Sequence, residues 1–293
     1  MIVLANILVI AVLSVAGSPV DSDDLARLLE RAKRDSTDLD SRLGLIEIYL
    51  EQGNFAQAED YLNQAQAIDS LSAKVFFLRG RYYDYQDDLP SALNNYNLAI
   101  DRDSTLSEAW RARAYLHEIF ANYELMLSDL NHALANTGDS AGVYYDIGVA
   151  YDYLGDTEKA GSSYKSALSC GAGFPEIFVN LGAYWADIGH LDSAGHYLEK
   201  AVAAGGNSPE LYYNLGMVDF ELGKYQSAIA DFYNCLSVSP DFAAAKLQLG
   251  YLYEMVGDTG MAIAYLEDFI ETAPMIYRDD ISRAKERLAR LRR

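Results

Sequence analysis

Residues 209–242 read PELYYNLGMVDFELGKYQSAIADFYNCLSVSPDF, and residues 141–174 read AGVYYDIGVAYDYLGDTEKAGSSYKSALSCGAGF. Glycine, alanine and aromatic residues stand at the same places in both stretches. The pattern returns every 34 residues, seven times from Leu39 onward, without an insertion or deletion. Such a period is typical of a stacked repeat array, which offers a long surface rather than a closed pocket. We therefore expect a binding protein rather than an enzyme.

The spacing divides most of the chain into seven units, in which each residue takes a position counted from the start of its unit. The units are residues 39–72, 73–106, 107–140, 141–174, 175–208, 209–242 and 243–274. Apolar residues recur at positions 4, 7, 8 and 11, and again at positions 17, 20, 24, 27 and 28. Each set falls on one face of a helix, so every unit is predicted to form an antiparallel helix pair.

Three positions describe how the two helices of a unit should meet. Position 15 is glycine in five units, as expected where a helix ends with a positive φ. Position 8 is glycine or alanine in most units, whereas positions 11 and 24 are usually large. Large side chains opposite small ones predict close, interdigitated packing of the pair.

The pattern resembles the tetratricopeptide repeat family over the whole of residues 39–274. The sixth unit carries the family's marks best, at Tyr212, Leu215, Gly216, Gly223, Tyr225, Ala228, Phe232 and Pro240. The resemblance implies an all-α fold, a right-handed superhelical α-solenoid of seven 34-residue helix-turn-helix repeats with N- and C-terminal extra helices. The third unit departs from the family, with His117, Ala121 and Met126 where Tyr, Gly and Ala are usual, so its helix pair is expected to splay.

The segments on either side of the repeats are predicted to contain the extra helices. Residues 17–38 form a linker and an N-terminal helix, of which residues 22–36 match the second helix of an incomplete unit. Residues 275–293 form a basic capping helix with one apolar stripe, at Ile281, Ala284, Leu288 and Leu291. Docking of this helix to an acidic partner or a lipid headgroup is the alternative to simple capping.

The first residues suggest export. Residues 2–16 are almost wholly apolar, a length that is short for a membrane span and normal for a signal-peptide core. Ser14-Val15-Ala16 fits a cleavage site after Ala16. No Lys or Arg precedes the apolar run, so an uncleaved anchor formed by residues 2–16 stays open. We expect signal peptide 1–16 and a periplasmic or extracellular protein, with membrane anchoring as the alternative.

Charge and cysteine content limit the partners. The chain has 43 acidic and 23 basic residues, a formal net charge of −20, which makes nucleic acid an unfavourable partner. Cys170 and Cys235 lie in the second helices of the fourth and sixth units, too far apart for a disulfide, and both are expected to be unpaired. Cys235 stands where most units have alanine, so it is expected to be buried.

No catalytic or metal-binding signature is present. His117-Glu118 lacks the second histidine of a zinc-protease motif, and His190 and His196 are spaced too far apart to share a metal on one helix. There is no phosphate loop, no Gly-x-Ser-x-Gly elbow and no Cys-x-x-Cys pair. We therefore predict no catalytic residues, no cofactor and no metal.

The resemblance implies that positions 2, 5, 6, 9, 12 and 13 of the first helices line a concave groove. The candidate partner-binding residues are Tyr115, Tyr145, Val149, Tyr153, Asn180, Tyr213, Asn214, Met217, Phe220, Tyr251, Met255, Glu210 and Glu221. The slots of the family's carboxylate clamp hold Leu43, Glu47, Phe77 and Asp146, so that clamp is absent. Aromatic groups beside many acids favour a neutral or basic extended segment, with Asn180 and Asn214 on its backbone.

We interpret the chain as a non-catalytic scaffold or adaptor for a protein or peptide partner. One alternative is a cell-envelope assembly or secretion factor that docks a membrane complex through its convex face or basic tail. Others are a substrate-presenting subunit of a separate enzyme, and self-association through the ends of the array. Membrane contact is expected only through the N-terminal segment or the basic C-terminal helix, and a monomer is expected.

Overall fold

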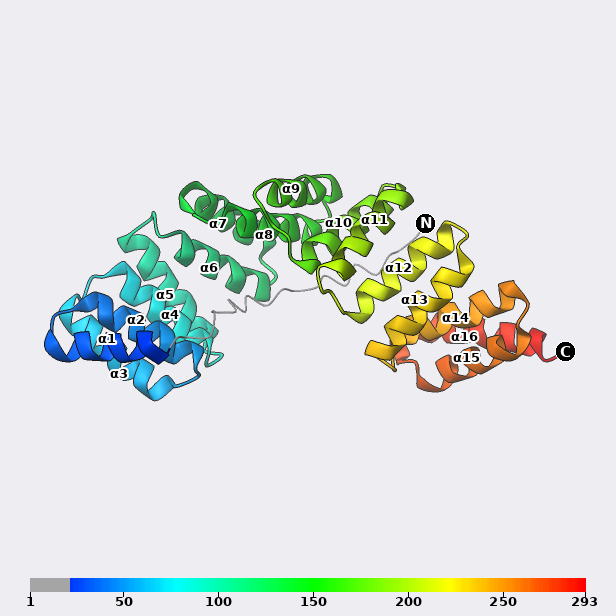
Figure 1. Cartoon of the computed structure of the whole chain (residues 1–293), viewed down its shortest axis with the longest axis horizontal. Coiled ribbons are helices and arrows are strands. Elements are labelled where there is room, and N and C mark those ends of the chain that lie inside the picture. The colour runs from blue at the N-terminus through cyan, green and yellow to red at the C-terminus, as the bar shows by residue number, and fades with distance from the viewer. Residues whose placement is uncertain (1–21) are drawn as a thin grey trace. The chain divides into compact units, whose positions relative to one another are not determined.

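The computed structural model describes residues 22–293, which are helical and contain no strand (Figure 1). The predicted signal peptide or anchor, residues 1–16, lies outside the described residues, as does the linker up to residue 21. The all-α repeat fold is confirmed, because the described helices follow one another in packed pairs. They form two compact units, residues 22–171 and residues 172–293, which are described separately below.

The N-terminal unit begins with one unpaired helix and continues with four pairs. Its helices are α1 (Ser22–Arg34), α2 (Leu39–Glu51), α3 (Phe55–Ile68), α4 (Ala73–Asp84), α5 (Leu89–Arg102), α6 (Ser107–Ile119), α7 (Tyr123–Asn136), α8 (Ser140–Tyr153) and α9 (Thr157–Ser169). The pairs are α2–α3, α4–α5, α6–α7 and α8–α9, and each first helix also packs on the second helix before it. Helix α1 packs on α2 as a preceding second helix would.

The C-terminal unit holds three pairs and a terminal helix. Its elements are α10 (Pro175–Asp187), α11 (Leu191–Ala203), α12 (Pro209–Glu221), α13 (Tyr225–Val238), α14 (Ala243–Val256), α15 (Thr259–Thr272), the 3-10 helix η1 (Met275–Tyr277) and α16 (Arg278–Leu291). Helix α16 packs on α15, and its Ala284 is fully buried. Continued counting places Ala284 at position 8 of an eighth unit, so α16 occupies the place of a further first helix.

The two helices of a pair meet most closely at position 8. A Cβ atom added to Gly80 or Gly148 would overlap the ring of Tyr96 or Tyr164, both of which are fully buried at position 24. At Gly216 the same atom would lie 2.7 Å from the ring of Phe232. A larger residue at position 8 would push the pair apart, so glycine here permits the packing.

All seven turns inside the pairs have a positive φ at position 15. Five of these residues are glycines, as predicted, and the other two are Asp87 (φ 60°) and Ala121 (φ 54°). A side chain with a Cβ atom is strained in this left-handed region, at a cost of about 1–2 kcal/mol for most residues. The second and third turns therefore carry strain that the glycine turns do not.

The expected splaying of the third repeat is wrong. Helices α6 and α7 pack as closely as the other pairs. Arg113 of α6 makes two 2.7 Å hydrogen bonds to Asp129 of α7, and His117 lies 3.6 Å from the same carboxylate. Met126 is buried in place of the usual alanine. The Arg113–Asp129 contact thus joins α6 to α7, together with the stacked rings of Trp110 and His132.

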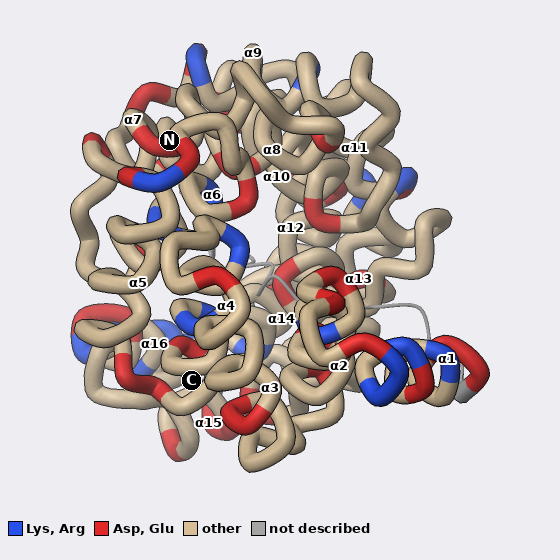
Figure 2. Tube along the Cα trace, turned by 90° about the vertical axis from the view of Figure 1, so that its left-hand side faces the viewer, with Lys and Arg blue, Asp and Glu red and all other residues tan. Residues whose placement is uncertain are grey.

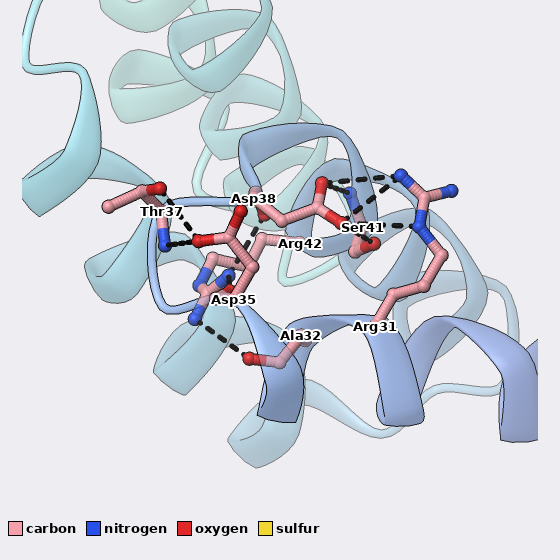
Figure 3. Close-up of polar contacts among 7 residues, drawn as sticks. All are labelled: Arg31, Ala32, Asp35, Thr37, Asp38, Ser41 and Arg42. Carbon is pink, nitrogen blue, oxygen red and sulfur yellow. Dashed lines mark hydrogen bonds and ion pairs between the residues drawn. The ribbon is translucent and has the colours of Figure 1, made fainter.

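Buried cations occupy position 4 in the first and last repeats, where apolar side chains were predicted. Arg42 is 5% exposed and donates to the backbone oxygens of Asp38 (2.9 Å), Asp35 (3.2 Å) and Ala32 (3.4 Å), at the end of α1 (Figure 3). Lys246, also 5% exposed, is 3.0 Å from Asp268. A cation near the C-terminal carbonyls of a helix is favourable, so Arg42 fastens α1 to the first repeat.

We predict that Ala121→Gly raises the free energy of unfolding by about 1 kcal/mol, because glycine adopts the left-handed turn without a steric cost. Urea denaturation of the full chain, followed by circular dichroism, measures the change. Gly155→Ala is the matched control in the next turn (φ 75°) and should lower the free energy of unfolding by a similar amount. An Ala121→Gly variant no more stable than the wild type contradicts the assignment of strain.

Candidate functional site

We use the name first-helix face for the side chains at positions 2, 5, 6, 9, 12 and 13 of the first helices. In the N-terminal unit these helices are α2, α4, α6 and α8, and in the C-terminal unit they are α10, α12 and α14. The predicted binding residues are divided between the two units, so each face is considered on its own. The chain is strongly acidic, and Lys and Arg are sparse along most of the trace (Figure 2).

In the N-terminal unit, two of the four predicted residues lie beneath the surface. Tyr145 and Val149 are 4% and 6% exposed, and the Tyr145 ring lies 5.7 Å from that of Tyr164. The expectation that these side chains are exposed for a partner is therefore corrected, because they pack in the core of the unit. Tyr115 and Tyr153 are half-buried and keep part of their rings at the surface.

Two of the three basic residues on this face, Lys74 and Arg111, form ion pairs with acids on or directly next to the neighbouring first helices, whereas Arg81 donates to the hydroxyl group of Tyr85. Lys74 of α4 lies 3.3 Å from Glu47 of α2 and 3.8 Å from Glu108 of α6. Arg111 of α6 lies 2.6 Å from Asp146 and 3.0 Å from Asp139. These bridges tie adjacent repeats together.

Burial shifts the titration of Asp146. The side chain is 17% exposed, and desolvation raises the pKa of its carboxyl group, while the charge and hydrogen bond of Arg111 act in the opposite direction. Desolvation is the larger effect, so the guanidinium compensates the buried charge only in part. Arg111 therefore lowers the pKa of Asp146 relative to a carboxyl group buried there without a cation, at the junction of α6 and α8.

Three carboxylates at position 12 accept hydrogen bonds from tyrosine hydroxyl groups. Tyr96 donates to Asp84 (3.3 Å) and Tyr164 donates to Asp152 (2.5 Å), each within one repeat. The third bond crosses between repeats, from Tyr153 to Glu118 (3.1 Å).

The Tyr153–Glu118 contact has two further features. The Tyr153 ring stacks on Tyr123, with centroids 4.3 Å apart, a partner that the sequence did not single out. Burial raises the pKa of Glu118, as it also raises the pKa of Asp84. The surface around Glu118 thus combines half-buried tyrosines with a carboxylate that is partly removed from water.

In the C-terminal unit, three predicted residues are buried. Asn180, Tyr213 and Asn214 are 7%, 6% and 3% exposed. The Tyr213 ring packs between those of Phe232 (5.8 Å) and Phe242 (5.4 Å), which corrects its assignment as an exposed aromatic contact. Within residues 22–293, Oδ1 of Asn214 has no hydrogen-bond partner.

The other predicted residues of the C-terminal unit reach the surface to different degrees. Glu210, Met217 and Phe220 are half-buried, whereas Glu221 and Met255 are exposed, the latter by 53%. Four of these side chains lie on α12 and Met255 lies on α14, so the set combines acidic and apolar groups on two first helices.

Tyr251 has an intramolecular partner that the sequence did not indicate. The guanidinium of Arg287, from α16, lies 4.3 Å from the centroid of the Tyr251 ring and 2.9 Å from Glu254. Part of the first-helix face of α14 is therefore covered by the C-terminal helix. Glu254 and Arg287 are 33 residues apart in the sequence, about one repeat.

Residues 22–293 contain no group of three His, Cys, Asp or Glu side chains arranged to hold a metal ion. None of the helices in this range is both apolar and long enough to cross a membrane. Cys170 and Cys235 are free thiols as predicted, and burial raises the pKa of Cys235 to about 12.

We predict that Arg111→Met lowers the free energy of unfolding by about 2 kcal/mol at pH 8, because it leaves Asp146 buried without its cation. The loss should be smaller at pH 5, since a carboxyl group whose pKa is raised in the folded state favours folding below that pKa and loses the contribution as the pH rises. Urea denaturation at the two pH values measures both effects.

Lys159→Met is the matched control for this prediction. Lys159 forms an ion pair with Asp156 that is 61% exposed on the lysine side, and such pairs contribute little. The control should change stability by less than about 0.5 kcal/mol at either pH. Equal effects of the two substitutions would contradict the role given to Arg111.

Sequence models described as tetratricopeptide repeat match residues 26–78, and also residues 141–169 and 209–242. The matches fall in both units and keep the 34-residue phase. No curated protein sequence matches the chain.

Many solved structures share the fold. A chain of the APC/C hetero-tetramer Cut9–Hcn1 has a TM-score of 0.67 and 19% identity, over 89% of this chain and 52% of that one, so this chain spans about half its length. Pseudomonas aeruginosa pilF has a TM-score of 0.65 and 17% identity, over 69% and 92%. YrrB, described as a TPR protein with an unusual peptide-binding site, has a TM-score of 0.54 and 17% identity, over 63% and 95%. These identities are low, so the likeness shows the fold alone.

Proposed function

Because the chain is a tetratricopeptide repeat protein, we propose that it is a non-catalytic interaction scaffold that binds an extended segment of another protein on its first-helix faces. The segment is neutral or basic. The protein acts as a monomer, with the partner rather than a second copy on these faces.

One observation carries this proposal: aromatic and methionine side chains remain at the surface beside carboxylates, while two of the three basic groups on the first-helix faces, Lys74 and Arg111, are already paired with acids. Tyr115 and Tyr153 lie beside Glu118 in the N-terminal unit, and Met217, Phe220 and Met255 accompany Glu210 and Glu221 in the C-terminal unit. Aromatic and Met residues are enriched at interfaces, and uncompensated acids favour a basic partner.

One comparison supports a peptide-like partner. YrrB, which has the same fold, is described as having an unusual peptide-binding site.

Selection of peptides from a random display library on the full chain tests the proposal. The double variant Glu210→Lys, Glu221→Lys should bind a selected peptide about tenfold more weakly at low salt, and its affinity should depend less on ionic strength, because attractive charges on the face have been reversed. Fluorescence anisotropy with the labelled peptide measures both quantities.

The matched control reverses two exposed acids on second helices of the same unit, Glu199→Lys and Glu271→Lys. It changes the net charge equally but leaves the first-helix face intact, so the affinity should change by less than about twofold. Equal weakening in both double variants, or selection of peptides that bind both normally, would exclude the face.

We further propose that residues 1–16 direct export and are removed, which makes the protein periplasmic or extracellular. When the full chain is expressed in a bacterium with two membranes, mass spectrometry should show a product that begins at Gly17, because small residues precede this bond. Ala16→Phe should retain the segment. Recovery of the wild type at full mass in the membrane fraction would instead favour an anchor at residues 2–16.

A second candidate function is docking of a membrane complex through the C-terminal helix. Met275 and Ile276 are 79% and 88% exposed, immediately before the basic helix α16. Exposed apolar residues beside Arg and Lys are typical of an interaction surface. Loss of envelope association in a Met275→Ser, Ile276→Ser variant would favour this candidate.

A further inference from the structure

The seventh repeat contains a guanidinium site that is filled from within the chain. Tyr251 at position 9 and Glu254 at position 12 lie one turn apart on α14. Arg287 stacks over the Tyr251 ring at 4.3 Å and forms a 2.9 Å ion pair with Glu254. Stacking on an aromatic face and pairing with a carboxylate are the two contacts that a planar guanidinium makes best.

The third repeat has the same two residues at the same positions. Residues 115–118 read YLHE and residues 251–254 read YLYE, and no other repeat combines tyrosine at position 9 with glutamate at position 12. The leucine between them, Leu116 or Leu252, is fully buried in both helices. Because this leucine fixes how each helix is turned, Tyr115 and Glu118 are presented on α6 as Tyr251 and Glu254 are on α14.

The site in the third repeat holds no cation. In residues 22–293, Glu118 forms no ion pair, and no Lys or Arg lies over the ring of Tyr115. Among the residues that the structure describes, the only hydrogen bond to the Glu118 side chain comes from the hydroxyl group of Tyr153, at 3.1 Å on Oε1. This bond orients the carboxylate without neutralising it.

The surroundings of Glu118 favour a cation. Burial and the nearby charge of Asp146 both raise the pKa of Glu118, while burial first, and then the charges of Asp84 and Glu118, raise the pKa of Tyr115. Arg111 is paired with Asp146, and the charge of Arg81 acts on Asp84, whereas no Lys or Arg of residues 22–293 is paired with Glu118. Ile119, which follows Glu118 in α6, is 46% exposed.

We propose that Tyr115 and Glu118 bind the guanidinium group of an arginine side chain in the partner segment. The inference rests on the proposed function, since it assigns one residue of the segment bound on the N-terminal first-helix face. Arginine fits better than lysine because an ammonium group cannot stack on the ring and has no planar pair of donors. The arrangement in the seventh repeat is the template, with Arg287 in the place of the partner's side chain.

The probe is the pentapeptide acetyl-Gly-Gly-Arg-Gly-Gly-amide, compared with the same peptide carrying citrulline, a neutral isostere, or lysine. The full chain is labelled at isoleucine methyl groups, and the NMR signal of Ile119 is followed during titration. The arginine peptide should bind at least about fivefold more tightly than the citrulline and lysine peptides.

Two isosteric Glu→Gln variants, one in the site and one as its control, test whether Glu118 binds the arginine peptide. Glu118→Gln should weaken the arginine peptide at least about tenfold, because it removes the charge and keeps the shape. Glu47→Gln is the matched control on α2: Glu47 is already paired with Lys74, so the affinity measured at Ile119 should be unchanged.

A third variant tests the template itself. Arg287→Gln empties the site in the seventh repeat, so the arginine peptide should then also shift Ile281, which packs in the same cluster as Tyr251. In the wild type, the NMR signal of Ile281 should not shift when the arginine peptide is added.

Equal affinities for arginine and citrulline, or an unaffected Glu118→Gln variant, overturn the inference. Library peptides that bind the first-helix face but show no preference for arginine would overturn it while leaving the proposed function in place. If the first-helix face selects no peptide but the arginine peptide still shifts the Ile119 signal specifically, the proposed function is overturned and the arginine site is kept.

Discussion

The close approach of the two helices at position 8, which is glycine in five of the seven pairs, is the constraint on which the rest of the structure depends. Where a ring fills position 24, as Tyr96, Tyr164 and Phe232 do, only a residue without a side chain fits opposite it. This contact sets the separation and rotation of the pair. Because it recurs every 34 residues, it also determines which side chains of the first helices can reach a partner.

Most of the fold follows from the period, because each helix pair needs only local information. Periodicity did not reveal the closed third repeat or the buried Arg42, since both depend on polar contacts between two helices. His117 and Ala121 suggested a splayed third repeat, but Arg113 and Asp129 close it from opposite helices. Arg42 is accommodated where most repeats have an apolar side chain, because the carbonyl groups of Ala32 and Asp35 at the end of α1 accept its hydrogen bonds.

The candidate site was predicted less well, for a physical reason. Positions 5 and 6 lie at the border between the face and the packing against neighbouring repeats, and five predicted residues at positions 5, 6 and 9 are buried, including Tyr145, Tyr213 and Asn214. Periodicity gives a helix face only to within a residue or so. The missed contacts join neighbouring first helices, such as Arg111 with Asp146 and Arg287 with Glu254. Opposite charges 33–35 residues apart were the signal that could have revealed them.

Position 12 shows how one slot takes different roles without a change of fold. Its carboxylate receives a tyrosine of the same repeat at Asp84 and Asp152, a tyrosine of the next repeat at Glu118, and an arginine of α16 at Glu254. Only the last of these partners cancels the charge. Counting carboxylates therefore misjudges the electrostatic character of the face, because hydroxyl groups orient a carboxylate while leaving it able to attract a cation. The repeats differ in which acids remain available, and this difference can give each part of the face its own preference for the bound segment.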